Sequence, residues 1–127
     1  MKGKLFCHCE CGFSPKMQLL NVLEKIEKLC GFELTINSAA RCEKHNAEVG
    51  GSKNSAHTLG LAADISYENS NQLYLLNKAI FSLEIKRTGL NPNKKFRHID
   101  IATGPVPHPI VGGIQSYPQD VDFSYPG

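Results

Sequence analysis

Two short segments of this chain alternate between aliphatic and reactive side chains, and this pattern constrains the fold more than any other feature. In residues 61–66, Asp64 would share one strand face with small neighbours, while aliphatic residues take the other face. In residues 96–101, His98 and Asp100 would share one face and two isoleucines the opposite face. A sheet with one apolar face has to be covered on that face. The sequence therefore predicts an α+β fold, with a small antiparallel sheet and helices packed on one face.

Helical periodicity supplies two helices to cover such a sheet. Ser14-Pro15 is typical of an N-cap and a first helical residue, and Gly31 is placed to end the helix that follows. A second helix can be capped by Asn69 or Ser70. The apolar stripes are Leu19, Val22, Leu23, Ile26, Leu29 and Cys30 in the first helix and Leu73, Leu76, Ile80 and Leu83 in the second.

The remaining segments are expected to form strands and a loop. A half-buried strand should run from residue 32 to about residue 38, and a further strand at residues 84–88 should precede a turn at residues 89–93. Residues 39–54 are polar and contain glycine, so we expect a loop over the sheet with one short helical turn at residues 42–48. Loops of this kind often carry functional residues.

The length of 127 residues suits one domain with its own core. No repeat or low-complexity linker divides the chain. After Thr103 the sequence is rich in Pro, Gly and Tyr, which predicts irregular structure on the surface. We therefore expect a single domain over residues 1–127, with an irregular tail from about residue 103.

Charge and hydropathy exclude two classes of partner. The 14 Lys and Arg residues exceed the 12 Asp and Glu residues by a net charge of +2, and they are too scattered for a nucleic-acid groove. No apolar stretch approaches the roughly 20 residues of a membrane span, and the first residues lack the apolar run of a secretory signal. We expect a monomer that is made in the cytoplasm.

Three of the five cysteines lie close together near the start of the chain. An odd number without a secretory signal argues against a full disulfide framework, so mostly reduced thiols are expected. Cys7, Cys9 and Cys11 could form a second, structural zinc site with His8 or a distant residue. Their one-residue spacing differs from the usual gaps of two to four residues, which argues against such a site. Small buried thiols or a local redox pair are the preferred interpretation.

His57, Asp64 and His98 have the chemistry of a catalytic zinc site. Two imidazoles and one carboxylate fill three positions of a tetrahedral zinc ion and leave the fourth for water. A His-x-Asp pair on a strand decides nothing by itself. Here Ser55 precedes His57 by two residues, Gly60 follows it, and Asp64 comes seven residues after His57. This combination predicts one catalytic Zn²⁺ ion and a hydrolase.

A longer motif surrounds these residues. It reads Arg41-Cys-x-x-His45-Asn46-x-x-Val49-Gly50-Gly51-x-x-x-Ser55-x-His57-x-x-Gly60-x-Ala62-x-Asp64, followed by Phe96-x-His98-x-Asp100. The motif resembles the zinc D-alanyl-D-alanine carboxypeptidases and related peptidoglycan endopeptidases, whose α+β fold is shared with the hedgehog signalling domain. The resemblance covers about residues 6–101. It implies that the zinc ligands are His57, Asp64 and His98, and that Ser55 supports the first ligand or the bound substrate.

By the same resemblance, Arg41 would bind a carboxylate of the peptide substrate. A planar guanidinium can donate two parallel hydrogen bonds to a carboxylate, which lysine cannot imitate. The alternative for Arg41 is a structural salt bridge to Glu43 or Glu48. Among the other histidines, His45 could line the substrate cleft or donate a hydrogen bond to an oxyanion.

The general base is the departure from the family pattern. Many relatives carry Glu or Asp three residues before the second histidine ligand, where this chain has Lys95. A charged lysine cannot accept a proton from zinc-bound water. Asp100 shares the strand face of His98 and could replace that base. Alternatively, Asp100 accepts the free N–H of His98 and fixes the tautomer of that ligand.

Two classes of function follow. The first is a zinc metallopeptidase that hydrolyses peptidoglycan stem peptides by attack of a zinc-bound water, as a D-Ala-D-Ala carboxypeptidase or a stem-peptide endopeptidase. The expected lack of a secretory signal suits a phage or prophage endolysin or tail component that reaches the cell wall by a phage-type release route. The alternative is a catalytically inactive, zinc-bearing peptidoglycan-binding or phage structural module.

Overall fold

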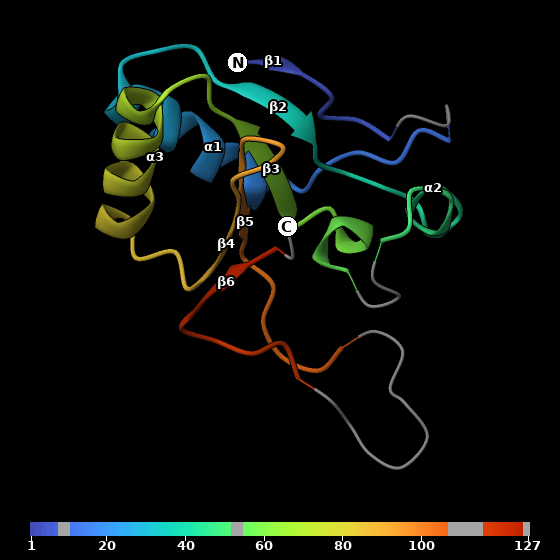
Figure 1. The fold of residues 1–127 in the computed structure, drawn as a ribbon. Helices are drawn as coiled ribbons and strands as arrows, with labels where there is room; N and C mark the ends of the chain where they lie inside the picture. The colour runs from blue at the N-terminus through green and yellow to red at the C-terminus, as the bar shows by residue number, and fades with distance from the viewer. Residues whose placement is uncertain (8–10, 52–54, 107–115, 126–127) are drawn as a thin grey trace.

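The computed structural model describes residues 1–7, 11–51, 55–106 and 116–125. These residues form a six-stranded sheet with the strand order β1-β2-β3-β5-β4-β6, together with three α-helices and a short 3-10 helix (Figure 1). The elements in chain order are β1 (Lys2–Gly3), α1 (Met17–Cys30), β2 (Thr35–Ser38), α2 (Glu43–Glu48), η1 (Ala56–Leu59), β3 (Ala62–Ser66), α3 (Ser70–Ser82), β4 (Arg87–Asn91), β5 (Phe96–Asp100) and β6 (Val121–Ser124). The predicted α+β class is confirmed.

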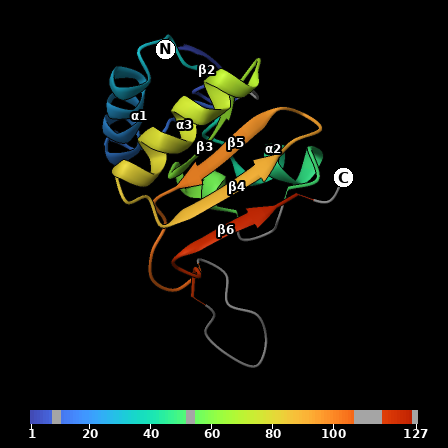
Figure 2. The ribbon, with the colours of Figure 1, turned by 60° about the vertical axis from the view of Figure 1, so that its left-hand side comes forward.

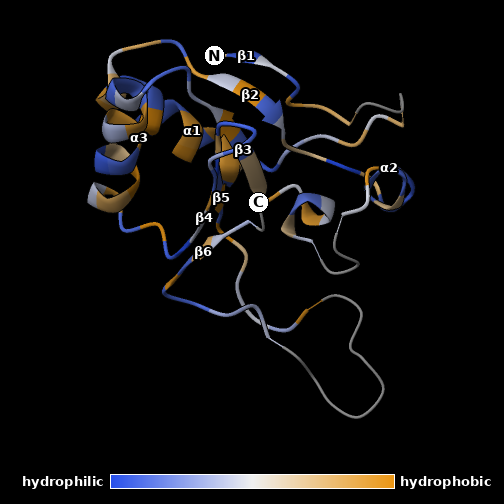
Figure 3. Cartoon of the chain, viewed as in Figure 1, coloured by the Kyte–Doolittle hydropathy of each residue, from blue (hydrophilic) through white to orange (hydrophobic). Residues whose placement is uncertain are grey.

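Helices α1 and α3 lie side by side on one face of the sheet (Figures 1 and 2). Each carries hydrophobic and hydrophilic residues in alternation, as Figure 3 shows, so each has one side to bury. The main core contains Leu19, Leu23, Ile26, Cys30, Ile36, Ala63, Ile65, Leu76, Ala79, Ile80 and Ile99. The aliphatic faces of β3 and β5 thus lie against the helices, and their polar faces point to the opposite side. None of the described helices is long and apolar enough to cross a membrane.

The sheet is antiparallel in its middle and parallel at both edges. Strands β2, β3, β5 and β4 pair in an antiparallel manner, as predicted. The edge strands β1 and β6 pair in parallel with β2 and β4. The expectation of an antiparallel sheet therefore needs this correction. Local alternation identifies strands, but the direction of an edge strand depends on where distant chain segments return to the sheet.

The two main helices agree with their predicted stripes, with one shifted boundary. Asn69 caps α3, because its Oδ1 accepts the backbone N–H of Gln72 at 2.9 Å. Gly31 ends α1 in a left-handed conformation, with φ of 78°. The start of α1 lies at Met17 and not at Pro15. The backbone N–H of Lys16 donates to the backbone oxygen of Gly60. A contact with a distant segment, and not the predicted cap at Ser14, therefore precedes the helix.

The prediction for the polar loop is confirmed at α2, whereas the prediction for the strand after α3 is wrong in its bounds. Helix α2 lies within the helical turn predicted for residues 42–48. Strand β4 begins at Arg87 and includes residues 89–91, where a turn was predicted; the turn occupies residues 92–95. Gly89 stands inside the strand because a Cβ atom there would lie 2.3 Å from the ring of Phe123. A glycine that makes room for a distant ring looks like a turn signal in the sequence.

The segment after Thr103 is more regular than predicted. Its described part includes β6, which pairs with β4 along the edge of the sheet (Figure 2). Asp122 binds the guanidinium of Arg97 through both carboxylate oxygens, at 2.9 and 3.2 Å, and accepts a hydrogen bond from Thr88. These contacts lie on the face of the sheet that the helices cover, and they fix β6 to β4 and β5. The next residue, Phe123, therefore faces the opposite side.

Candidate metal centre

Three ionisable side chains from three elements meet on the polar face of the sheet. Asp64 of β3 and His98 of β5 are direct partners in the pairing of these strands, and His57 comes from η1. Oδ1 of Asp64 lies 3.4 Å from Nε2 of His57 and 2.8 Å from Nδ1 of His98. All three side chains are buried. The structure therefore brings together the residues that the sequence singled out.

Each imidazole also has an acceptor on its outer nitrogen. Nδ1 of His57 lies 2.6 Å from the backbone oxygen of Ala39, and Nε2 of His98 lies 2.8 Å from Oδ2 of Asp100. Without a metal, the inner nitrogens face Asp64 and share protons with its carboxylate. With a metal bound, a proton on each outer nitrogen would leave the lone pair of each inner nitrogen for the ion. These are the tautomers that a metal ion requires from two histidine ligands.

The spacing of the three inner atoms fits a zinc ion. Zinc–nitrogen and zinc–oxygen bonds of about 2.0–2.1 Å at tetrahedral angles separate neighbouring ligand atoms by roughly 3.3–3.4 Å. The pair His57 and Asp64 meets this separation at 3.4 Å, while His98 is closer to Asp64, at 2.8 Å. The three atoms all lie within 4.8 Å of one another. A small increase in the distance between Nδ1 of His98 and Oδ1 of Asp64 would give the spacing of a tetrahedral site. These residues can therefore bind a metal.

Burial and mutual hydrogen bonds shift the pKa values in this cluster. Burial alone would raise the pKa of Asp64, but hydrogen bonds with His57 and His98 outweigh it and hold the pKa below the usual range. Burial alone would lower the pKa of His98, but hydrogen bonds with Asp100 and Asp64 outweigh it and raise the pKa. Asp64 is therefore an anion at neutral pH, which is the form that binds a metal.

Asp100 is buried behind His98 and has partners on both carboxylate oxygens. Oδ2 accepts from Nε2 of His98, while Oδ1 accepts from Nε of Arg87 and from the backbone N–H of Ala102. Burial would raise the pKa of Asp100, but the hydrogen bonds from His98 and Arg87 outweigh it and lower the pKa. Of the two roles considered for Asp100, this geometry favours orienting His98 over accepting a proton from water.

Local capping explains why His57 faces the sheet. Oγ of Ser55 accepts the backbone N–H of His57 at 3.2 Å and so caps η1. Gly60 ends the same turn in a left-handed conformation, with φ of 71°. A Cβ atom at position 60 would also lie 3.0 Å from the backbone oxygen of Ser14. Ser55 thus has a structural contact with the turn that carries His57, a candidate metal ligand.

The cluster opens into a cleft of about 580 Å³. Arg41, Gly50 and Gly51 line it from the loop before η1, and Lys94 lines it from the turn before β5. Nε of Arg41 is buried and has no hydrogen-bond partner among the described residues. Burial lowers the pKa of Arg41, although an arginine in a protein stays charged. The cleft therefore has a cationic wall beside the metal-ligand cluster.

The alternative expected for Arg41 was a salt bridge to a glutamate of the same loop. In the part of the chain that the structure describes, no ion pair joins Arg41 to Glu43 or Glu48. Arg41 and Val49 also line a neighbouring depression, and His45 lies there and not in the cleft itself. Lys95 is an exposed residue of the β4–β5 turn and does not line the cleft.

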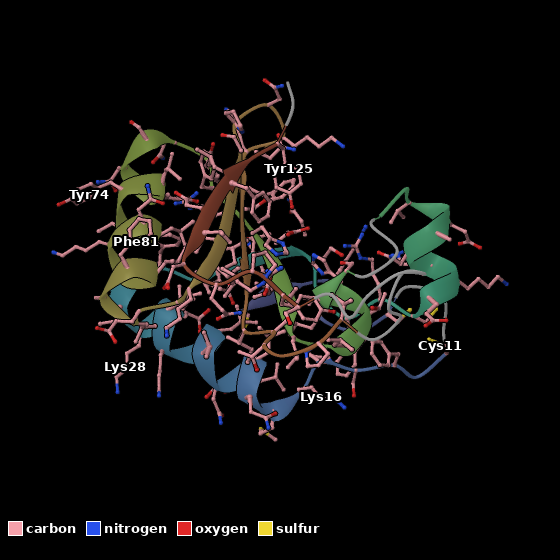
Figure 4. All side chains as sticks on the ribbon, turned by 90° about the horizontal axis from the view of Figure 1, so that it is seen from below. Cys11, Lys16, Lys28, Tyr74, Phe81 and Tyr125 are labelled. Atoms are coloured by element: carbon pink, nitrogen blue, oxygen red, sulfur yellow. The ribbon has the colours of Figure 1, made fainter. Side chains whose placement is uncertain are left out.

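Phe123 and Tyr125 complete the cleft, and neither was expected there from the sequence. The ring centroid of Phe123 lies 5.5 Å from that of His98 and 5.3 Å from that of Tyr125, which extends from the end of β6 (Figure 4). Burial raises the pKa of Tyr125 well above its usual value, and the charge of Asp64 raises it further. The phenol is therefore a neutral hydrogen-bond donor. Aromatic residues at alternate positions after Val121 were the signal that could have revealed a strand here.

The model of the Peptidase M15 family matches residues 4–100 of the chain. The chain belongs to the peptidase M15 family. Members of this family are zinc-dependent, so the family and the His57–Asp64–His98 cluster together indicate a metal-dependent hydrolase of peptide bonds. Searches of curated proteins and of solved structures gave no match. The matched range ends at Asp100, so the aromatic pair of the M15 peptidase lies outside it.

Proposed function

We propose that this M15 peptidase uses zinc to hydrolyse peptidoglycan stem peptides, either by removing a terminal D-alanine or by cutting within the stem. The observation that carries the proposal is the convergence of His57, Asp64 and His98 in a cleft whose cationic wall includes Arg41. A metal site suits a peptide bond near a carboxylate when it lies next to a guanidinium whose Nε has no hydrogen-bond partner in the described part of the chain. The site of action would be the cell wall, which the protein would reach by a phage-type release route.

The three ligands would hold the metal through Nε2 of His57, Oδ1 of Asp64 and Nδ1 of His98. Bound zinc would supply a Lewis acid that polarises the scissile carbonyl and lowers the pKa of a water molecule toward neutrality. The outer contacts to Ala39 and Asp100 keep the two imidazoles in the required tautomer and orientation.

Arg41 would bind the terminal carboxylate of the substrate. Its Nε is buried without a hydrogen-bond partner in the ranges that the structure describes, and an unpaired donor in such a place gains most from a bound anion. A guanidinium that binds a carboxylate through two parallel hydrogen bonds also fixes the direction of the peptide. This arrangement favours carboxypeptidase specificity over internal cleavage.

Tyr125 would donate a hydrogen bond to the substrate carbonyl as negative charge develops on its oxygen. The raised pKa keeps the phenol protonated throughout the neutral pH range. A fixed donor of this kind stabilises the transition state more than the ground state. Asp100 would act through His98 as a positioning residue.

Hydrolysis of defined muropeptides by the purified full chain tests the proposal. The protein would be incubated with and without a chelator, and products followed by mass spectrometry. Chelator-sensitive loss of one D-alanine would support a carboxypeptidase, whereas shorter stem fragments would support an endopeptidase. Absence of any product from zinc-loaded protein across the substrate panel would refute the peptidase proposal.

A second candidate is a zinc-bearing module that binds peptidoglycan without cleaving it, or a structural phage component. One observation favours it: Asp64 and Asp100 are the carboxylates that line the described part of the cleft, and both are bound to imidazoles. Neither carboxylate is therefore free to accept a proton from water. Sedimentation of the zinc-loaded protein with purified cell walls, in the absence of released fragments, would distinguish this candidate.

A further inference from the structure

A second cluster of metal-binding side chains lies apart from the cleft. Cys7 and Cys11 belong to the segment between β1 and α1, and Cys42 lies just before α2. The three Sγ atoms all lie within 4.8 Å of one another. Figure 4 shows Cys11 beside helix α2, although some 30 residues separate these segments in the chain. The sequence offered a zinc site at Cys7, Cys9 and Cys11, against which the one-residue spacing argues; Cys9 lies outside the described residues.

Backbone hydrogen bonds support two of the three sulfurs. The N–H of Cys42 donates to Sγ of Cys7 at 3.3 Å, and the N–H of His45 donates to Sγ of Cys42 at 3.4 Å. Such donors can remain in place when a cysteine sulfur binds a metal as a thiolate. The N–H of Cys7 donates to the oxygen of Phe13, which folds this segment back on itself. The backbone thus holds the cysteines in position for a shared ligand.

The distances between the three sulfurs suit a shared zinc ion better than simple packing of thiols. Zinc–sulfur bonds of about 2.3 Å at tetrahedral angles place neighbouring sulfurs roughly 3.8 Å apart. Three sulfurs within 4.8 Å of one another would reach that spacing through small side-chain movements. A disulfide could join two of the three but would leave the third without a role. One of the three, Cys11, is exposed, which a thiol that serves core packing would not be.

Cys30 provides the contrast within the same chain. It is buried in the main core, and its Sγ donates to the backbone oxygen of Leu75. Burial raises the pKa of Cys30 to about 11, so this thiol stays protonated. Cys30 has the surroundings of a cysteine that fills space. In the cluster, by contrast, Cys7 and Cys42 accept backbone N–H donors, and Cys11 is exposed.

We propose that Cys7, Cys11 and Cys42 bind a structural zinc ion, separate from the metal of the cleft. This ion would tie the N-terminal segment to the loop that carries Arg41, the residue next to Cys42. The backbone N–H of Arg41 donates to the oxygen of His57 at 3.0 Å, so the same loop also contacts the first ligand of the cleft. The second zinc would therefore hold the cationic wall of the cleft in place.

Metal stoichiometry of the intact chain tests this proposal. Elemental analysis after exhaustive removal of loosely bound metal should give two zinc ions per chain for the wild type. The variant Cys42→Ser should retain one, and the double variant His57→Ala, His98→Ala should also retain one. Cys30→Ser is the matched control, because it changes a buried cysteine outside the cluster, and it should retain two.

Cobalt substitution identifies which site each ion occupies. Cobalt bound to thiolates has a near-ultraviolet charge-transfer absorption that a site of imidazoles and a carboxylate lacks. This absorption should persist in the double histidine variant and disappear in Cys42→Ser. The wild type provides the same test without any substitution, in case a variant fails to fold.

Two outcomes would overturn the proposal. One is a single zinc ion in the wild type with no thiolate absorption in its cobalt form. The other is a disulfide among the clustered cysteines in protein prepared under reducing conditions, detected by mass spectrometry. Neither outcome would refute the proposed peptidase, because that proposal is tested by hydrolysis of muropeptides and not by the metal content of the cysteine cluster. Conversely, a chain inactive on every muropeptide could still show thiolate-bound cobalt.

Discussion

The two candidate metal clusters of this M15 peptidase are built on different supports. In the cleft, His98 and Asp64 stand on paired strands, and the outer atoms of both histidines are held by further acceptors. In the cysteine cluster, the ligands lie on loops, and two sulfurs are held by backbone N–H groups. A strand framework can hold ligands in place before a metal binds, whereas loops gain order from the metal itself. The first cluster is thus suited to chemistry and the second to stabilising a loop.

Removal of a ligand from the strand framework gives the largest expected effect. The variant Asp64→Asn should lower hydrolysis by roughly a thousandfold or more, because a catalytic metal contributes several kcal/mol and each 1.4 kcal/mol is tenfold in rate. The thermal unfolding midpoint should be measured as well, because Asp64 is buried and contacts both histidines. Ser66→Ala, on the same face of β3, is the control for activity and stability. Full activity of the Asp64 variant would show that the cleft does not work through this cluster.

The support behind His98 should have the next largest effect. Asp100→Asn should weaken zinc binding by about tenfold to a hundredfold, the usual consequence of losing the carboxylate behind a histidine ligand. Zinc affinity can be measured by competition with a coloured chelator, and hydrolysis at saturating zinc should largely recover. Asp120→Asn, an exposed position, is the control. Unchanged zinc affinity with a large fall in kcat would instead identify Asp100 as the proton acceptor.

The aromatic residues of the tail allow a test of the cleft outside the matched family range. Tyr125→Phe removes one hydroxyl and keeps the ring, and should lower kcat by about tenfold to a hundredfold, as for a hydrogen bond to a charged group. Because burial raises the pKa of Tyr125, the phenol donates below that raised pKa and stops donating above it. The ratio of wild-type to variant kcat should therefore stay constant from about pH 6 to about pH 9, because this range lies below the usual tyrosine pKa of about 10. Tyr74→Phe, exposed on α3, is the control.

Arg41 connects the two clusters, so its replacement sharpens the comparison between them. Arg41→Lys keeps the charge and loses the paired hydrogen bonds, and should raise KM by about tenfold for substrates with a free terminal carboxylate. A substrate with an amidated terminus should bind wild type and variant alike. Equal loss on both substrates would mean that Arg41 does not bind the carboxylate. Zinc content should remain that of the wild type.

Thiol labelling should give the smallest effect on activity but resolves the cysteines directly. At pH 8 an alkylating reagent should modify Cys30 slowly in folded protein, because burial raises its pKa to about 11 and the thiolate is the reactive form. A chelator should accelerate labelling of Cys7, Cys11 and Cys42, since a bound metal protects thiolates. Cys30 should react at the same slow rate with and without chelator. Labelling is read by peptide mass spectrometry.

Much of the metal centre could be predicted from short-range patterns. Alternation placed Asp64 and His98 on the polar faces of two strands, and the cap Ser55 marked the turn that carries His57. These features depend on residues a few positions apart, so sequence periodicity records them. The role of Asp100 stayed open because its second oxygen binds Arg87, a partner on another strand.

The rest depended on contacts between distant segments. Strand β4 was misplaced because Gly89 makes room for the ring of Phe123. The tail was predicted as irregular because its strand is held by Asp122 binding Arg97, and such an ion pair has no signature in local alternation. The site of Cys42 in the cysteine cluster was missed for the same reason.

By itself, the sequence determined the α+β class, the helices that cover the sheet and the three candidate metal-binding residues of the cleft. Each of these arises from burial of one face of a helix or strand, which is repeated locally along the chain. The tertiary structure alone decided which oxygen supports His98, where Tyr125 lies, and that Cys42 joins Cys7 and Cys11. These outcomes depend on how the chain returns to the sheet after its helices, and no pattern of neighbouring residues encodes that path.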